Sequence, residues 1–125
     1  MAWDMFSKYI RLRDCLKTTS KVDYGLCYTC GRMHHFKDLQ CGHFQQGRGN
    51  SILFDETCHA QCYVCNCLKH GEQLIFRRRL VEEFGEKRAQ LLENKRYQVK
   101  KYSIVELDCL YHHYVREYKN LLKET

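Results

Sequence analysis

Two cysteine pairs are the residues of this sequence whose types and spacing most clearly suggest chemistry. Cys27 and Cys30 stand two residues apart in CYTC, and Cys62 and Cys65 repeat that spacing in CYVC. Each short loop can turn two thiolates towards one ion, and four thiolates complete a tetrahedron around zinc with no position left for water. The spacing therefore predicts a structural zinc site, with free or redox-active thiols as the alternative.

His43 lies between the two pairs, in the stretch QCGHF, and the residue types leave three roles open to it. It can be a metal ligand, a base or a packed core residue. A second metal site formed by Cys41, His43, Cys58 and His59 is one alternative, because all four are soft ligands. The other reading of the spare cysteines is that they are reduced and buried.

His43 and Asn66 together suggest hydrolysis of a phosphodiester. If a helix begins near Cys65, zinc ties its first turn to the segment that carries His43. A neutral imidazole can take a proton from water at about pH 7, while a divalent ion stabilises charge on the phosphate. The carbonyl oxygen of Asn66 suits Mg²⁺ or Mn²⁺ better than zinc. The residue types alone equally allow a packed histidine beside an aromatic ring.

The elements that would position these residues are short in the middle of the chain and helical at both ends. Residues 3–17 place Trp3, Phe6 and Ile10 near helical spacing, which predicts a packing helix. The pattern then becomes irregular and rich in Cys, Gly and His up to about residue 70. Short strands are predicted at residues 39–45 and 51–55, joined by the loop QGRGN.

The C-terminal part is predicted to be helical. One helix is expected over residues 72–84, ended by Gly85, and a second over residues 86–94. Ser103 and Glu106 form a capping-box pattern that opens a long last helix. Its predicted buried stripe consists of Ile104, Leu107, Tyr111, Val115, Tyr118 and Leu122.

Composition limits the class of protein. The 125 residues fit one small domain, divided into an N-terminal helix at 1–22, a core at 23–71 and a helical extension at 72–125. The charged N-terminal segment is neither a signal peptide nor a membrane span, so the chain is expected in the cytoplasm with reduced thiols. The odd number of cysteines, nine, agrees with this expectation.

Basic residues exceed acidic ones by 21 to 15, which gives a formal net charge of +6. Nine basic and four acidic residues fall in the segment 77–101. This excess of positive charge favours binding of a polyanion such as DNA through counterion release. The alternative interpretation is that these charges form a solvated helix face.

Several motifs in order resemble the phage recombination endonucleases of the NinG/Rap type. These are C-x-x-C-G, GHF, LFDE, H-x-Q-C-x-x-C-N and HGE, accompanied by the segments FSKYIRLRD and FGEKRAQLLE. The cysteine pair followed directly by Asn is also similar to the endonuclease VII type of zinc-containing resolvase. The resemblance covers most of the chain and implies an α+β fold with a zinc-stapled ββα-metal (HNH) core.

The resemblance also implies roles for single residues. His43 would be the general base, and Asn66 a ligand of a catalytic Mg²⁺ or Mn²⁺. The two cysteine pairs would hold the structural zinc, and His59 would lie on the active-site side or orient a neighbour. Gly42 stands where many HNH nucleases have Asp, so Asp55 and His59 are the candidates for the missing metal ligand.

One further departure from the HNH pattern concerns Thr57. It replaces an Asn whose amide would brace the loop before the third zinc cysteine, and this substitution is expected to weaken activity.

The expected function is divalent-metal-dependent cleavage of DNA, with double-stranded or branched recombination intermediates as the substrate implied by the resemblance. A homodimer through the C-terminal helix would supply two active sites. The alternative function is a non-catalytic zinc module that binds DNA or a protein. Five basic residues near the predicted site are expected to contact phosphates, with solubility as their other reading: Arg48, Lys69, Arg77, Arg78 and Arg79.

Overall fold

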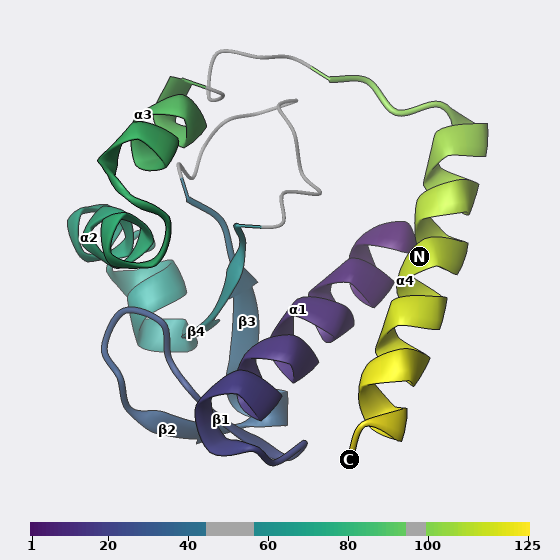
Figure 1. Cartoon of the computed structure of the whole chain (residues 1–125), viewed down its shortest axis with the longest axis horizontal. Coiled ribbons are helices and arrows are strands. Elements are labelled where there is room, and N and C mark those ends of the chain that lie inside the picture. The colour runs from purple at the N-terminus through teal and green to yellow at the C-terminus, as the bar shows by residue number, and fades with distance from the viewer. Residues whose placement is uncertain (45–56, 95–99) are drawn as a thin grey trace.

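The computed structural model describes residues 1–44, 57–94 and 100–125, and it begins with helix α1, Ala2–Thr19 (Figure 1). Phe6 and Ile10 are fully buried on the face of α1 that packs against Cys41 and Cys58. The helix ends at Ser20, whose φ of 61° is left-handed. The predicted N-terminal helix is therefore confirmed, and it covers the middle of the chain.

A two-stranded ribbon follows α1 and carries the first cysteine pair. Strand β1, Tyr24–Leu26, pairs antiparallel with β2, Met33–His35. The sequence predicted irregular chain here. Strands of three residues are too short to show the alternation of apolar and polar residues from which strands are predicted.

The second sheet carries His43 at its end. After the 3₁₀ turn η1, Phe36–Asp38, strand β3, Leu39–Gly42, pairs antiparallel with β4, His59–Cys62. The first predicted strand is thus confirmed in part, since it ends earlier than residue 45. Its partner is β4, which the sequence did not predict as a strand. The strand predicted at residues 51–55 lies outside the described residues.

The two faces of the β3–β4 pair have different neighbours. Leu39 and Ala60 pack against Cys15 of α1 on one face. Because side chains alternate along a strand, Gln40 and Gln61, which are register partners, point to the other face. The helical part that follows β4 covers that second face.

This helical part begins with η2, Val64–Leu68, a single turn of π-helix, and continues with α2, Gln73–Phe84, and α3, Glu86–Asn94. Helices α2 and α3 build a second core, which consists of Phe44, Phe76, Leu80, Ala89 and Leu92. Gly85 has φ 91° and donates its N–H to the carbonyl of Val81, so it ends α2 as predicted. The two predicted helices are confirmed.

The last helix, α4, Ile104–Lys123, packs beside α1 (Figure 1). Its predicted capping box is present, since Ser103 and Glu106 exchange side-chain to backbone hydrogen bonds. The predicted buried stripe is wrong, because no residue of α4 is buried and Ile104 is 86% exposed. The helix packs on α1 along the side that carries Tyr114, whose ring lies 4.9 Å from that of Phe6.

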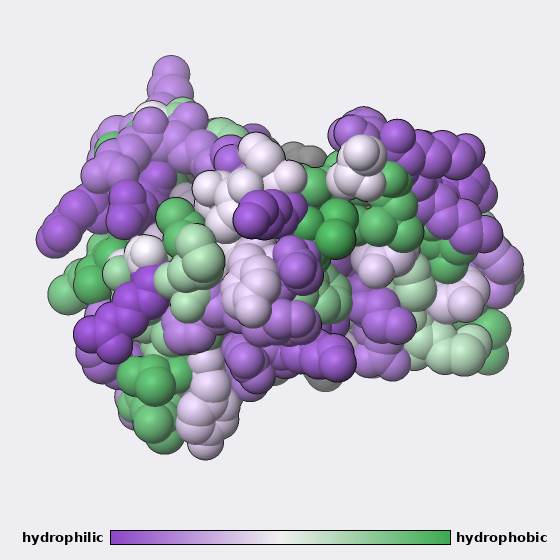
Figure 2. All heavy atoms as spheres, turned by 90° about the horizontal axis from the view of Figure 1, so that it is seen from below, coloured by the Kyte–Doolittle hydropathy of each residue, from purple (hydrophilic) through white to green (hydrophobic). Residues whose placement is uncertain are grey.

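Figure 2 shows α4 as the right-hand part of the molecule, with hydrophobic side chains gathered in the hollow between it and the rest. Within the described residues, none of the helices is both long enough and apolar enough to span a bilayer. The small α+β architecture expected from the sequence is confirmed for these residues.

Candidate metal centre and the groups around it

The structure brings the four cysteines of the two pairs into one group, called here the four-cysteine cluster. Cys27 directly follows β1, Cys30 lies in the turn of the ribbon, Cys62 ends β4, and Cys65 lies in η2. Their sulfur atoms all lie within 4.8 Å of one another, and the Sγ atoms of Cys30 and Cys62 are 3.9 Å apart. A tetrahedral zinc ion with bonds of about 2.3 Å requires sulfur separations of about 3.8 Å. The cluster therefore fits a structural zinc ion.

The backbone around the cluster is shaped for metal ligation. Gly31 adopts φ 74°, which closes the turn after Cys30, and its N–H donates to the carbonyl of Cys27 at 2.9 Å. The N–H of Cys62 donates to Sγ of Cys27 at 3.3 Å. Amide donors of this kind stabilise a thiolate and orient its lone pairs towards the ion.

The protonation of the cluster also favours a cation. Burial raises the pKa of Cys27. Hydrogen bonds from the backbone amides of Cys30 and Cys62 lower this pKa, and the net shift is downward. Burial and the charge of Cys27 raise the pKa of Cys65. One thiolate therefore hinders ionisation of the next, and all four ionise together only when a positive ion compensates their charge.

His43 follows the last residue of β3, and its ring lies against α1. Its imidazole is stacked on the indole of Trp3, with centroids 5.0 Å apart and an interplanar angle of 15°. Nε2 of Gln73 donates to the carbonyl of His43 at 3.4 Å. The Cys58 thiol also interacts with the His43 side chain, and burial raises the pKa of that thiol well above its usual value.

Gly42 has no room for a side chain. A Cβ atom built on Gly42 would lie 1.8 Å from Oε1 of Gln61, which is fully buried. Nε2 of Gln61 donates to Thr29 at 3.0 Å and to the carbonyl of Gly71 at 2.9 Å, so the side chain is fixed in place. The position that carries Asp in many HNH nucleases is thus filled from the neighbouring strand.

Asn66 lies in η2, directly after Cys65, and contacts β3. Its Nδ2 donates to Oε1 of Gln40 at 2.8 Å, and the thiol of Cys67 donates to the same oxygen at 3.2 Å. The four-cysteine cluster therefore holds Asn66 against β3. Because the His43 ring lies against α1, the described contacts place these two side chains on different sides of β3.

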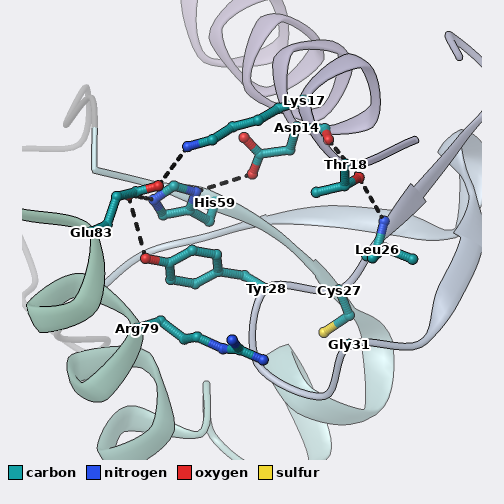
Figure 3. A pocket seen from close by; sticks show the side chains of 10 residues that line it. All are labelled: Asp14, Lys17, Thr18, Leu26, Cys27, Tyr28, Gly31, His59, Arg79 and Glu83. Atoms are coloured by element: carbon teal, nitrogen blue, oxygen red, sulfur yellow. Dashed lines mark hydrogen bonds and ion pairs between the residues drawn. The ribbon is translucent and has the colours of Figure 1, made fainter. Parts of the chain in front are cut away.

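His59 is buried between two carboxylates from different helices (Figure 3). Its Nδ1 lies 3.2 Å from Oδ2 of Asp14 in α1, and its Nε2 lies 3.3 Å from Oε1 of Glu83 in α2. The Tyr28 ring stacks on the imidazole with centroids 3.6 Å apart and an angle of 3°. A cavity of about 180 Å³ borders these groups. His59 thus joins α1, α2 and the loop of the first cysteine pair.

The charges around His59 compensate one another. Asp14 accepts hydrogen bonds from the N–H of Ala60 at 2.7 Å and from Nε of Arg13 at 3.0 Å. Burial raises the pKa of Asp14, but the contacts with His59 and Arg13 lower it, and the net shift is downward. A hydrogen bond with His59 is the largest cause that lowers the pKa of Glu83, to about 2. Both carboxylates are therefore held in their charged form.

The sequence reasoning missed Asp14, Glu83 and Tyr28. A signal for Asp14 was present, because it follows Phe6 and Ile10 at steps of four residues and so falls on the buried face of α1. A charged residue on an apolar face needs a buried partner. Which residue partners it depends on contacts between distant parts of the chain, which the sequence pattern does not reveal.

The alternative second metal site is not found: in the described part of the chain, the four cysteines are the only group of three or more His, Cys, Asp or Glu ligand atoms that all lie within 4.8 Å of one another. Cys41 and Cys58 pack with the apolar residues of α1. His59 points to the other side of the sheet, towards Tyr28. These two cysteines therefore contribute to packing, and the Cys58 thiol also contacts His43.

The basic residues expected to contact phosphates differ in their surroundings. Arg77 pairs with Glu86 and Glu93 of α3 and so ties α2 to α3. Arg79 lies 3.6 Å from Glu82 and borders the cavity of Figure 3. The exposed members that follow η2 are Lys69, Arg78 and Arg79. Arg48 and the proposed ligand Asp55 lie outside the described residues.

Comparisons with known proteins agree with the motif pattern. A search of curated proteins and a search of solved structures each found no significant match. A family model described as "Bacteriophage Lambda NinG protein" matches residues 2–124. Because this match spans nearly the whole chain, the chain belongs to the NinG family.

Proposed function

We propose that this NinG-family protein is a divalent-metal-dependent DNA endonuclease that acts on branched recombination intermediates. In this proposal β3, β4 and η2 correspond to the ββα-metal unit of HNH nucleases. The observation that supports the proposal is a pair of hydrogen bonds from the segment that follows β4. Asn66 in η2 donates to Gln40 of β3, and Gln73 at the start of α2 donates to the carbonyl of His43, which directly follows β3. The scissile phosphate would lie at this end of β3.

His43 is the proposed general base. Its ring is neither fully buried nor fully exposed, so it can accept a proton from a water molecule at the surface. Stacking on Trp3 and the hydrogen bond from Gln73 to its carbonyl restrict where the ring can lie. A base with a fixed position is what removal of a proton from the attacking water requires.

Asn66 is the proposed protein ligand of a Mg²⁺ or Mn²⁺ ion. Because its Nδ2 donates to Gln40, the carbonyl oxygen Oδ1 is the atom with which Asn66 would bind a cation. The ion would stabilise negative charge on the phosphate and on the leaving oxygen. Of the two further ligand candidates, His59 faces Asp14 and Glu83. We therefore assign His59 a structural role and retain Asp55 as the proposed second ligand.

The proposed DNA contacts include the exposed side chains Lys69, Arg78 and Arg79 and also Arg48. Positive charges at such positions attract the phosphate backbone, in line with the net charge of +6. The position of Arg77 is better explained by its ion pairs with Glu86 and Glu93 of α3 than by a contact with DNA.

A second candidate is a non-catalytic zinc module that binds DNA or a protein. The observation that favours it is the filled space beside Gly42, since a carboxylate ligand cannot be placed there. The positions of the His43 and Asn66 side chains on different sides of β3 favour it as well. Metal-dependent cleavage separates the two candidates.

The test is incubation of the zinc-loaded protein with supercoiled plasmid and with a synthetic four-way junction, with and without added Mg²⁺. The proposal predicts cleavage only with the ion. Asn66→Ala should raise the Mg²⁺ concentration needed for half-maximal cleavage, whereas Asn120→Ala, at an exposed position of α4, should not. Binding of either DNA without Mg²⁺-dependent cleavage would instead support the module.

A further inference from the structure

The stacked pair of Trp3 and His43 joins the first turn of α1 to the end of β3. The two rings are nearly parallel, at 15°, with centroids 5.0 Å apart. Trp3 lies outside the segment between the cysteine pairs, so neither the zinc spacing nor the histidine motif points to it. The contact appears only once α1 folds across the β3–β4 sheet.

Trp3 is itself held by a row of aromatic side chains. Its ring lies 5.6 Å from that of Phe6, which is fully buried. The Phe6 ring meets Tyr114 of α4 edge-on at 4.9 Å. Trp3 therefore has a fixed place on α1, and the indole is a firm surface for the imidazole.

The backbone carbonyl and the side chain of His43 have further partners besides Trp3. Gln73 donates to its carbonyl at 3.4 Å, and the buried Cys58 thiol interacts with its side chain. The stack on Trp3 is a contact that covers a face of the imidazole ring, and the contact with Cys58 adds to it.

We propose that Trp3 is a positioning residue for His43, and this proposal rests on the proposed nuclease function. A general base must lie within hydrogen-bonding reach of the attacking water, with its nitrogen aimed at the proton. Without the indole, the His43 ring loses the contact on its face and spends less time in the reactive orientation. The N-terminal helix is then part of the active site and more than a cover for the core.

The prediction for activity concerns kcat. Trp3→Leu keeps an apolar side chain but removes the flat ring, and kcat for junction cleavage should fall by about tenfold to a hundredfold, the size expected for a misplaced catalytic group. KM should stay the same, because Trp3 does not contact DNA in this proposal. Trp3→Phe restores a ring and should recover most of the loss.

Tyr24→Leu is the matched control. Tyr24 meets His35 with centroids 5.2 Å apart, in the β1–β2 ribbon. This substitution removes another aromatic–histidine contact of similar size at a different place. Cleavage by Tyr24→Leu should equal that of the parent if the effect of Trp3 depends on His43.

A second readout does not depend on cleavage. Trp3 is the only tryptophan of the chain, so its fluorescence reports on this site alone. The imidazole of His43 is stacked on the indole, with centroids 5.0 Å apart, so its removal changes the surroundings of the fluorophore. At one fixed pH, the emission of His43→Gln should therefore differ from that of the parent.

The outcomes are distinct. Junction cleavage by Trp3→Leu at the parental kcat, or equal emission from the parent and His43→Gln, would overturn the role of Trp3 and leave the proposed nuclease function standing. A parent protein that does not cleave DNA with Mg²⁺ would overturn the proposed function and this role with it. A lower kcat at constant KM, with recovery in Trp3→Phe, supports the role.

Discussion

Single residues explain why this chain departs from the pattern that its motifs resemble. Gln61 is the clearest case, because its side chain crosses from β4 to β3 and occupies the space next to Gly42. It is fully buried and bonded to Thr29 and Gly71. Glycine at position 42 is thus required by packing, whatever chemistry takes place at His43.

Gly42→Ala should therefore destabilise the protein, because the new methyl group would lie 1.8 Å from Oε1 of Gln61. Overpacking of this kind costs about 1–3 kcal/mol. Urea unfolding of the zinc-loaded protein measures the cost. In a Gln61→Ala background the same substitution should cost clearly less, because the clashing atom is gone. Equal costs in the two backgrounds would show that Gln61 does not determine residue 42.

Asp14→Asn should destabilise the protein more strongly. The carboxylate of Asp14 is buried and accepts hydrogen bonds from Ala60 and Arg13 beside His59. Removing its charge leaves the largely buried guanidinium of Arg13 without its carboxylate partner, and loss of one member of such a pair costs about 3–5 kcal/mol. The free energy of unfolding in urea tests this.

Asp108→Asn is the control for Asp14. Asp108 lies 3.5 Å from His112 on the exposed side of α4, with 70% of its side chain exposed. Its pair is worth at most about 1 kcal/mol. Similar losses for the two substitutions would contradict the special role of Asp14.

At the scale of elements, the parts that sequence patterns could predict are those formed by local interactions. The bounds of α3, the glycine that ends α2 and the capping box at Ser103 all depend on residues within a few positions of one another. The four-cysteine cluster was predictable because ligand spacing is also local. The pairing of β3 with β4 was not, because it depends on the distant contacts that α1 makes with both strands.

The same distinction applies to the groups around the site. His43 and Asn66 could be selected from motifs, whereas the contacts of His43 with Trp3 and of His59 with Asp14 join residues at least forty positions apart. The periodicity of apolar residues along the sequence does not predict contacts between such distant residues. Ile104 shows the opposite error, since its helical spacing predicted burial but its side chain is 86% exposed.

The attachment of α2 to the core should depend on pH in the acid range. The pKa of Glu83 is lowered from 4.5 to about 2, chiefly by its hydrogen bond with His59. Because the folded-state pKa lies below the unfolded one, the stabilisation is complete above pH 4.5 and is lost as the pH falls towards 2. Glu83→Gln should be less stable than the parent above this range and should approach it within the range.

Urea unfolding of both proteins, from pH 7 down to the lowest pH at which elemental analysis still finds one zinc ion per chain, measures this difference. Glu124→Gln, at the C-terminal cap of α4, is the control and should match the parent at pH 7. Equal stability of Glu83→Gln and the parent at pH 7 would contradict the assigned cause.

At the scale of the whole molecule, the four-cysteine cluster links three segments from the middle of the chain. It joins the β1–β2 ribbon, the end of β4 and η2. The apolar residues are divided among several small clusters, and a chain of 125 residues buries only a limited apolar surface. Much of the folding free energy should therefore come from metal binding.

Cys62→Ser should lose the zinc ion and the cooperative unfolding transition. Zinc content by elemental analysis and thermal unfolding by circular dichroism test both effects. Cys109→Ser is the matched control, because Cys109 is an exposed thiol of α4 and lies outside the cluster. A Cys62→Ser protein that melts like the parent would show that the fold does not depend on the ion.

The central claim is that His43 acts as the base in metal-dependent DNA cleavage. The most direct measurement is the rate at which the parent and His43→Ala cleave a four-way junction in Mg²⁺, at equal zinc content and equal thermal stability. Loss of a general base predicts a rate at least about a hundredfold lower for His43→Ala, while the parent cleaves only with the ion. Equal rates for the two proteins, or no cleavage by the parent, would contradict the claim.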